Sequence, residues 1–369
     1  MKKLLSVLLS FCFGYVSLHA IGEINCRSTQ AKSTLKILNR ASKHSPLFGH
    51  QDALLYGQDW RIDSSDSLYQ KSDICSVCGM YPYVLGLDLS MIEKGSEKNY
   101  DGCLFRQMRE AAIVHHRRGG IITLSWHMFN PVTGGDAWDN SMNNVVHQIL
   151  TNHIVQLKFF KWLDRGADFI NQLVDEKGEK IPILFRPFHE CNIMGFWWSG
   201  KMCSNEEYIE LWKLIYDYYV QTKQMNQLIW VYSPYNVQKE SEILAKYPGD
   251  EYVDVIGYER YQLGARTFEE GATRFAKGAS NGLDVTLAFA RPRKKIVAFT
   301  ETGFQGIPYD KWWTEALANA IKGKNISYVL VWRNGVSKKH YHGPCPKSSS
   351  SADFMRLVNA KQIKLLNIK

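Results

Sequence analysis

Eight short apolar runs alternate with longer helix-like stretches along this chain, and this alternation limits its possible folds more than any other feature. The runs are rich in β-branched and aromatic residues and lie at 47–54, 81–90, 120–127, 181–190, 227–234, 253–261, 295–303 and 327–334. Near-continuous apolar runs are typical of parallel strands covered on both faces, which need crossover helices between them. Eight βα units over about 290 residues fit the size of a TIM barrel, whereas a doubly wound sheet usually has fewer strands. We therefore predict an α/β fold, a single-domain (β/α)8 TIM barrel.

The helix between the fourth and fifth runs has a recognisable beginning. Ser204 is followed three residues later by Glu207, the spacing of a capping box. Apolar residues then recur at three- and four-residue steps between Tyr208 and Tyr219, the period of one helix face. Similar patterns lie at 104–114, 145–173, 268–276 and 309–321, and a last one lies near 351–359. No linker interrupts the sequence, so we predict that 47–369 form the barrel and that 21–46 lead into it.

The first 20 residues have the layout of a secretory signal peptide. Lys2 and Lys3 precede an apolar run at 4–18, and His19-Ala20 supplies a small residue for cleavage. The run is shorter than the roughly 20 residues that a membrane span needs. We therefore expect 1–20 to be removed, and the chain to be secreted or periplasmic, without a membrane span.

Charge and cysteine content narrow the possible partners. The formal charge is +9, yet the dense basic clusters at 115–118 and 291–295 are not interleaved with aromatics, so we predict solvated faces and no nucleic-acid partner. Seven of the eight cysteines follow the signal peptide, and some can form disulfides whose connectivity a sequence cannot give. Cys75 and Cys78 form a C-x-x-C pair without a second pair of finger-like spacing, which favours structural cysteines over a metal site. We expect a monomer without a metal or cofactor.

Two of the predicted strands end in glutamates. The fourth run closes with Arg186-Pro187-Phe188-His189-Glu190, and the seventh contains Thr300-Glu301-Thr302. Active-site residues of this fold lie at the carboxyl ends of strands. A partly buried carboxylate is costly unless something pairs or uses it. One alternative is a structural salt bridge, for instance with Arg186.

A pair of carboxylates across a barrel mouth is what a glycosidase uses. One carboxylate attacks the anomeric carbon, and the other gives a proton to the leaving oxygen and later takes one from water. Retention of configuration requires the two groups roughly 5–5.5 Å apart, whereas roughly 6.5–9.5 Å predicts inversion. The sequence does not measure this separation.

Several long segments resemble the glycoside hydrolase family 26 β-mannanases. They are GHQDALLYG (49–57), HHRRGGIITLSWHMFNPVTGG (115–135), RPFHE with a following FWW (186–190 and 196–198), YPGDEYVDVIGYERYQ (247–262), TETG (300–303) and VWRN (331–334). The resemblance implies a (β/α)8 barrel, a retaining mechanism without a metal, and β-1,4-mannan, glucomannan or galactomannan as the substrate. It also implies that Glu190 is the acid/base and that Glu301 is the nucleophile.

The resemblance extends to residues that surround this pair. Tyr261 corresponds to a tyrosine that hydrogen-bonds the nucleophile, and Trp332 to the floor on which the reacting sugar stacks. His127 would line the subsite next to the cleavage point, and His189 would contact the sugar and the nucleophile. As isolated residues, both histidines could equally be satisfied core histidines.

Five further residues are candidates for the pocket wall. Arg333 and the pair Asp59-Trp60 are plausible pocket-wall residues. Trp197 and Trp198 are either loop packing or sugar platforms, because a sugar's apolar face stacks on aromatic rings.

Two departures from the family pattern affect the subsites. Gly195 replaces an aromatic residue that commonly walls the subsite, and Glu259 stands where the family tends to show an aspartate. A related hydrolase of β-1,3-xylan or mixed-linkage glucan is therefore an alternative, and a non-catalytic glycan-binding barrel is another. The sequence does not distinguish endo from exo action.

Overall fold

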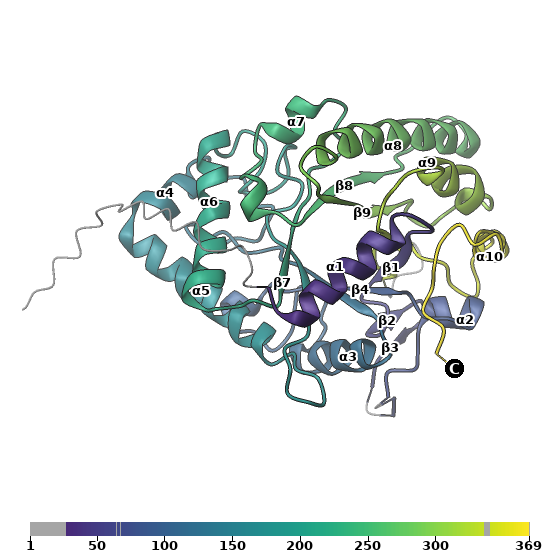
Figure 1. The fold of residues 1–369 in the computed structure, drawn as a ribbon, viewed down its shortest axis with the longest axis horizontal. Helices are drawn as coiled ribbons and strands as arrows, with labels where there is room; N and C mark the ends of the chain where they lie inside the picture. The colour runs from purple at the N-terminus through teal and green to yellow at the C-terminus, as the bar shows by residue number, and fades with distance from the viewer. Residues whose placement is uncertain (1–26, 64, 67, 336–339, 369) are drawn as a thin grey trace, which may run out of the picture.

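Eight parallel strands close into a barrel in this computed structural model, which describes residues 27–63, 65–66, 68–335 and 340–368. Each strand pairs with its neighbours in chain order, and the first pairs with the last (Figure 1). Every predicted run contains one strand, so the prediction of a single-domain (β/α)8 barrel is confirmed. The strands are β1 (Leu47–Gln51), β4 (Val84–Asp88), β5 (Ile121–Ser125), β6 (Ile183–Arg186), β7 (Leu228–Tyr232), β8 (Val255–Tyr261), β9 (Ile296–Gly303) and β10 (Tyr328–Val331).

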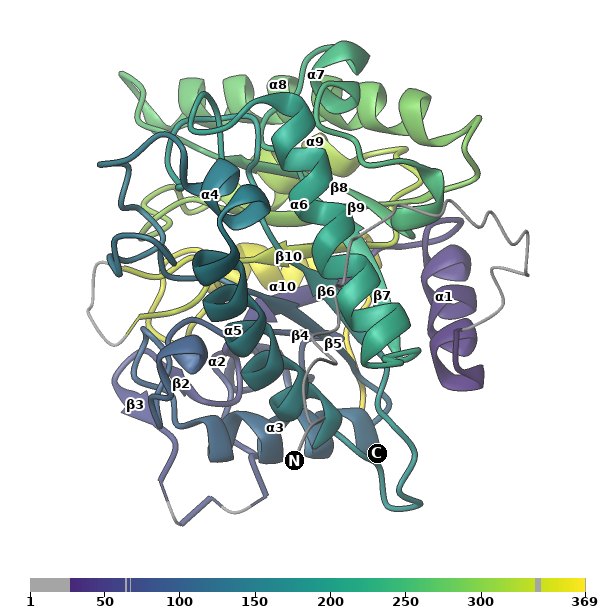
Figure 2. The ribbon, with the colours of Figure 1, turned by 90° about the vertical axis from the view of Figure 1, so that its left-hand side faces the viewer.

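Helices surround the strands, as the two views of Figures 1 and 2 show. A small antiparallel hairpin, β2 (Tyr56–Gly57) and β3 (Trp60–Arg61), follows β1. The helices are α1 (Thr29–Ala41), α2 (Asp73–Cys78), α3 (Phe105–Arg117), α4 (Val145–Thr151), α5 (His153–Asn171), α6 (Asn205–Asp217), α7 (Glu240–Leu244), α8 (Phe268–Ala290), α9 (Ala318–Ile321) and α10 (Ser351–Asn359).

Helix ends follow the capping residues of the sequence. Ser204 and Glu207 form the predicted capping box at the start of α6. The single helix predicted over 145–173 is wrong, because the chain breaks at Asn152, which ends α4 and begins α5. The Asn152 side chain accepts a hydrogen bond from the backbone N–H of Ile154 at 3.0 Å, which starts a new helix.

Two other predicted helices differ in extent from those observed. The helix predicted over 268–276 continues to Ala290 as α8, because small and apolar residues keep facing the barrel. The region predicted as a helix over 309–321 begins with a π-helical turn at Trp312–Leu317, and only α9 at its end is α-helical.

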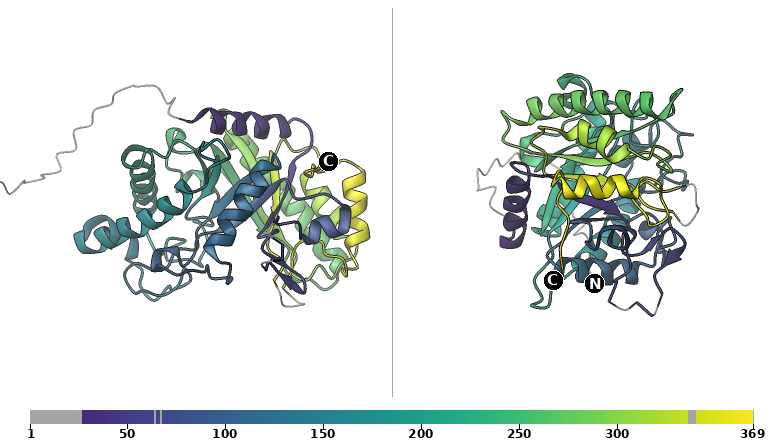
Figure 3. Two further views of the ribbon diagram at one scale, coloured as in Figure 1. Left: turned by 90° about the horizontal axis from the view of Figure 1, so that it is seen from below. Right: turned by 90° about the vertical axis from the view of Figure 1, so that its right-hand side faces the viewer.

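The lead-in segment covers the amino-terminal end of the barrel. Ala31 and Leu38 of α1 belong to one buried cluster with residues near the strand starts, among them Leu47, Val84 and Ile121. Figure 3 shows α1, in purple, and α10, in yellow, on different sides of the molecule. This end is closed by apolar packing, so the opposite end of the strands is the one open to substrate.

The six cysteines of the described region are free thiols, whereas Cys26 and the predicted signal peptide lie outside the described residues. Among the helices of the described region, none has both the length and the apolar character that a bilayer crossing needs.

Candidate active site

The backbone after β6 turns sharply and carries Glu190 to the mouth of the barrel. Phe188 and Glu190 adopt left-handed backbone angles, with φ of 48° and 53°. Such angles are uncommon for residues other than glycine, and they persist where the surrounding structure enforces them. The Glu190 N–H donates to the Ser233 carbonyl at 2.8 Å, which ties this turn to the end of β7.

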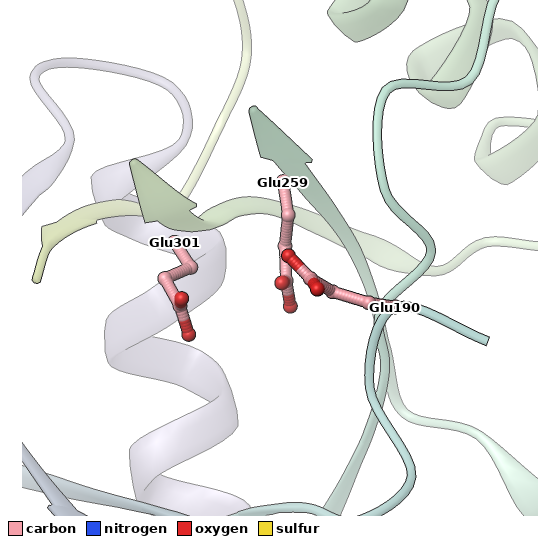
Figure 4. Close-up of side chains that lie close together, drawn as sticks. All are labelled: Glu190, Glu259 and Glu301. Atoms are coloured by element: carbon pink, nitrogen blue, oxygen red, sulfur yellow. The ribbon is translucent and has the colours of Figure 1, made fainter. Parts of the chain in front are cut away.

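Glu190 meets Glu301 of β9 and Glu259 of β8 at this mouth (Figure 4). Each of the three glutamates has a carboxylate oxygen within 4.8 Å of an oxygen of the other two. A gap between Glu190 and Glu301 of this size agrees with the short separation of retaining glycosidases. It is shorter than the roughly 6.5–9.5 Å separation with which inverting enzymes leave space for a water molecule.

The guanidinium of Arg186, at the end of β6, donates hydrogen bonds to two of these carboxylates. One nitrogen donates to Glu301 Oε2 at 2.5 Å, and the other donates to Glu259 Oε1. The remaining Glu301 oxygen, Oε1, accepts from the Tyr261 hydroxyl at 2.7 Å. The structural alternative of an Arg186 salt bridge is therefore observed for Glu301 but not for Glu190. These hydrogen bonds on both oxygens fix the orientation of the Glu301 carboxylate.

The surroundings of Glu190 favour the protonated form of its carboxyl. Burial raises the pKa of its carboxyl well above the usual range, and the neighbouring Glu259 and Glu301 carboxylates raise it further. The positive charge of Arg186 opposes this effect but does not outweigh it. A carboxyl held protonated beside a carboxylate held by Arg186 and Tyr261 is the division of roles that acid-assisted glycosyl transfer needs.

Two histidines stand next to the carboxylates. His127, after β5, donates through Nδ1 to Asp88 Oδ2 at 2.8 Å, and its ring lies edge-on to His189 with centroids 4.6 Å apart. Burial would lower the pKa of His127, but the Asp88 carboxylate outweighs burial and raises it. Burial and the charge of Arg186 lower the pKa of His189 well below its usual value. His127, whose pKa is raised, therefore lies beside His189, which stays neutral.

An aromatic surface continues outward from these histidines. Trp138 stacks on His127 with centroids 5.2 Å apart, and Tyr100 lies next to Trp138 at 5.6 Å. Trp138 and Tyr100 are 45% and 56% exposed, so both present open ring faces to solvent. On the inner side, Trp332 lies 5.9 Å from His127. This row of rings is suited to the apolar faces of successive sugars.

A pocket lies at the ends of β8 and β10. Its volume is about 460 Å³, and its lining includes Tyr261, Trp332 and His342. Tyr261 connects this pocket with the site, because its hydroxyl donates to Glu301.

Trp197 and Trp198 do not reach this space. Both are 0% exposed, and their indole N–H groups donate to the carbonyls of Met128 and His189. Neither ring offers a free face in this structure, so the sugar-platform interpretation gives way to the loop-packing alternative. Trp198 instead holds the backbone of His189 in place at 2.9 Å.

Trp60 and Arg333 have their described polar contacts with other acidic residues. The Trp60 indole N–H donates to buried Asp73 at 2.7 Å, and Trp60 lines a separate pocket of about 460 Å³. Arg333 pairs with Asp101 at 3.2 Å. Neither residue contacts Glu190 or Glu301 through a described hydrogen bond.

The structure adds site residues that the sequence analysis did not select. Asp88 ends β4, so the strand-end rule that selected Glu190 and Glu301 could have found it. Trp138 lies in a long loop without strand periodicity, and only its exposure in the fold identifies it. An added Cβ at Gly195 would meet no atom within 4 Å, so the position of the missing aromatic residue is open space.

The three glutamates are also the group of the described region whose ligand atoms lie close enough to hold a metal ion. Arg186 already supplies a cation to two of them, at Glu259 and Glu301.

Comparison with known proteins agrees with this geometry. A family model described as Glycosyl hydrolase family 26 matches residues 24–334. The chain is similar to the structure of a GH26 beta-mannanase from Bacteroides ovatus, with 36% identity, a TM-score of 0.86, and coverage of 92% of this chain and 96% of that chain.

Two curated relatives are both described as mannan endo-1,4-beta-mannosidases. A mannan endo-1,4-beta-mannosidase of Bifidobacterium adolescentis is 30% identical over 93% of this chain, which spans only 35% of that relative's length. A mannan endo-1,4-beta-mannosidase of Bacillus subtilis is 27% identical, over 86% of this chain and 84% of the relative.

Proposed function

The chain belongs to glycosyl hydrolase family 26, and from this membership and the site geometry we propose that it hydrolyses β-1,4-mannosidic bonds of mannan, glucomannan or galactomannan with retention. One observation carries the proposal: two carboxylates within 4.8 Å of each other, one kept protonated and the other held by Arg186 and Tyr261. The descriptions of the relatives supply the substrate class.

The proposed reaction has two displacements. In the first, Glu301 attacks the anomeric carbon, the glycosidic C–O bond breaks, and Glu190 gives its proton to the leaving oxygen. In the second, Glu190 takes a proton from water, the water oxygen bonds to the anomeric carbon, and the ester to Glu301 breaks. Both carboxyl groups then return to their starting protonation states.

Substrate contacts follow from the residues around the pair. We assign the floor under the reacting sugar to Trp332, and polar contacts near the cleavage point to His127 and His189. Trp138 and Tyr100 offer exposed rings for sugars further along the chain. Their surface supports a polymeric glycan as the substrate.

Exchange of each glutamate tests the assignment. Glu190→Ala should lower kcat/KM on mannan by about 100- to 10,000-fold, the usual contribution of acid–base catalysis. The same variant should lose far less on an aryl β-mannobioside with a dinitrophenolate leaving group, which departs without a proton. Glu301→Ala should lose both activities.

Glu176→Gln is the control, because this glutamate has a 70% exposed side chain and forms only a surface pair with Arg117. NMR of the first-formed product should show the retained anomer. An inverted product, equal losses of Glu190→Ala on both substrates, or a preference for β-1,3-xylan or mixed-linkage glucan over mannan would contradict the proposal.

We also propose export through residues 1–20 and action as a monomer. Secretion of the full chain with a new amino terminus at residue 21, detected by mass spectrometry, tests the first. Light scattering of the mature protein tests the second.

A further inference from the structure

Glu259 is a third carboxyl in the site, with no role so far in the reaction. An irregularity in the pairing of β8 and β9 falls between Tyr258 and Glu259 and sets Glu259 directly opposite Glu301. A bulge of this kind re-aims a side chain next to an active site. Glu259 is 0% exposed, so its carboxyl faces the inside of the barrel and not the substrate.

The two oxygens of Glu259 have different surroundings. Oε1 accepts from Arg186 and from the Ser233 hydroxyl. Oε2 is buried and has no hydrogen-bond partner in the described part of the chain. A buried carboxylate oxygen without a partner is costly, unless it is protonated or shares a neighbour's proton.

The charges around Glu259 do not balance if every carboxyl is ionised. Arg186 supplies one positive charge from β6, and Glu190 and Glu301 face Glu259 across gaps within 4.8 Å. The phenols of Tyr235 in the loop after β7, Tyr261 of β8 and Tyr328 of β10 lie near it, and burial raises the pKa of each, so they add no charge near neutrality. The three carboxyls around one guanidinium therefore do not all ionise together near neutrality.

We propose that Glu259 is a positioning residue that keeps Glu190 protonated and draws one arm of Arg186 away from Glu301. This inference rests on the proposed function, since it concerns the acid of that reaction. It differs from the roles of the reacting pair, because Glu259 acts through Glu190 and Arg186 and does not touch the sugar.

Titration of Glu259 itself supports the proposal. Burial raises its pKa, Arg186 lowers it, Glu301 raises it again, and the result is about 7. Glu259 therefore gains its charge as the pH passes neutrality. A new negative charge within 4.8 Å of Glu190 opposes loss of the Glu190 proton, so the acid stays functional to higher pH.

The test is the pH dependence of kcat/KM on a mannooligosaccharide. Glu259→Gln keeps the shape of the side chain and removes its charge, so the alkaline limb should move to lower pH by about one to two units. Glu259→Asp keeps the charge and should leave that limb within about half a unit of wild type.

Asp353→Asn is the matched control. Asp353 is equally buried and accepts from Arg356 and the Thr314 hydroxyl, the same kinds of donor, but it belongs to α10. It should lower stability without moving either limb.

An alkaline limb that stays in place in folded Glu259→Gln, or that moves to higher pH, would overturn the inference. If Glu259→Gln does not fold, the ¹³C carboxyl titrations of Glu190 and Glu259 are both measured in wild type. The inference predicts that Glu259 loses its proton first and that Glu190 loses its proton only at higher pH, and the reverse order overturns it. A wild-type protein without activity on mannan would instead refute the proposed function.

Discussion

Replacement of Asp88 by asparagine should destabilise the barrel in a pH-dependent way. Asp88 is buried and accepts from the Ser90 N–H at 2.9 Å, the Ser125 hydroxyl at 2.6 Å and His127 Nδ1 at 2.8 Å. Removing one partner of a buried ion pair costs about 3–5 kcal/mol. The unfolding entropy of about 2.1 cal/mol/K per residue gives about 0.7 kcal/mol/K for a barrel of roughly 340 residues, so the expected Tm decrease is about 4–7 °C.

The pH dependence follows from the directions of the two pKa shifts. Burial would raise the pKa of Asp88, but His127 and Ser125 outweigh burial and hold it below its usual value. Its contribution is therefore present above about pH 3.9 and is lost as the pH falls. The raised pKa of His127 adds stability that is complete below about pH 6.5 and is lost as the pH rises through the folded-state value.

The Tm difference between wild type and Asp88→Asn should therefore be largest between about pH 4 and 6.5. Calorimetric scans at several pH values measure this difference. Asp284→Asn is the control, because Asp284 forms a 2.6 Å pair with Lys324 but has a 62% exposed side chain. Such pairs contribute about 0–1 kcal/mol. A Tm difference below about 2 °C at pH 5.5, or one that grows steadily up to pH 9, would refute the reasoning.

Two further predictions concern the aromatic residues. Trp138→Ala should raise KM on long mannooligosaccharides by about tenfold, because about 1–2 kcal/mol of ring stacking is lost. The same variant should leave mannobioside hydrolysis nearly unchanged. An equal loss on both substrates contradicts the role of Trp138 as a sugar platform. Trp332→Ala should reduce kcat/KM on mannan with a small change in Tm. The buried Trp198→Ala should instead cost about 3–5 kcal/mol of stability, and thermal scans that rank the two variants the other way would contradict the assignment of floor and core.

Local patterns in the sequence determined the framework of this protein. Run length and apolar composition identified all eight strands, because a strand covered on both faces must be apolar along its length. The Ser204–Glu207 spacing located the start of α6, because a capping box is a contact between residues three apart. Position at a strand end selected Glu190 and Glu301, because the strands' carboxyl ends meet at one mouth.

Only the tertiary structure decided which side chains meet at the site and which have an open face. Trp198 and Trp138 are the same residue type in loops, yet one is 0% exposed and the other 45%, because exposure depends on chain segments far away in the sequence. The irregular pairing of β8 with β9 turned Glu259 toward Glu301, and register between strands is a property of the pair and not of either strand. The protonation of Glu190 has the same origin, since burial and two carboxylates from other strands raise its pKa.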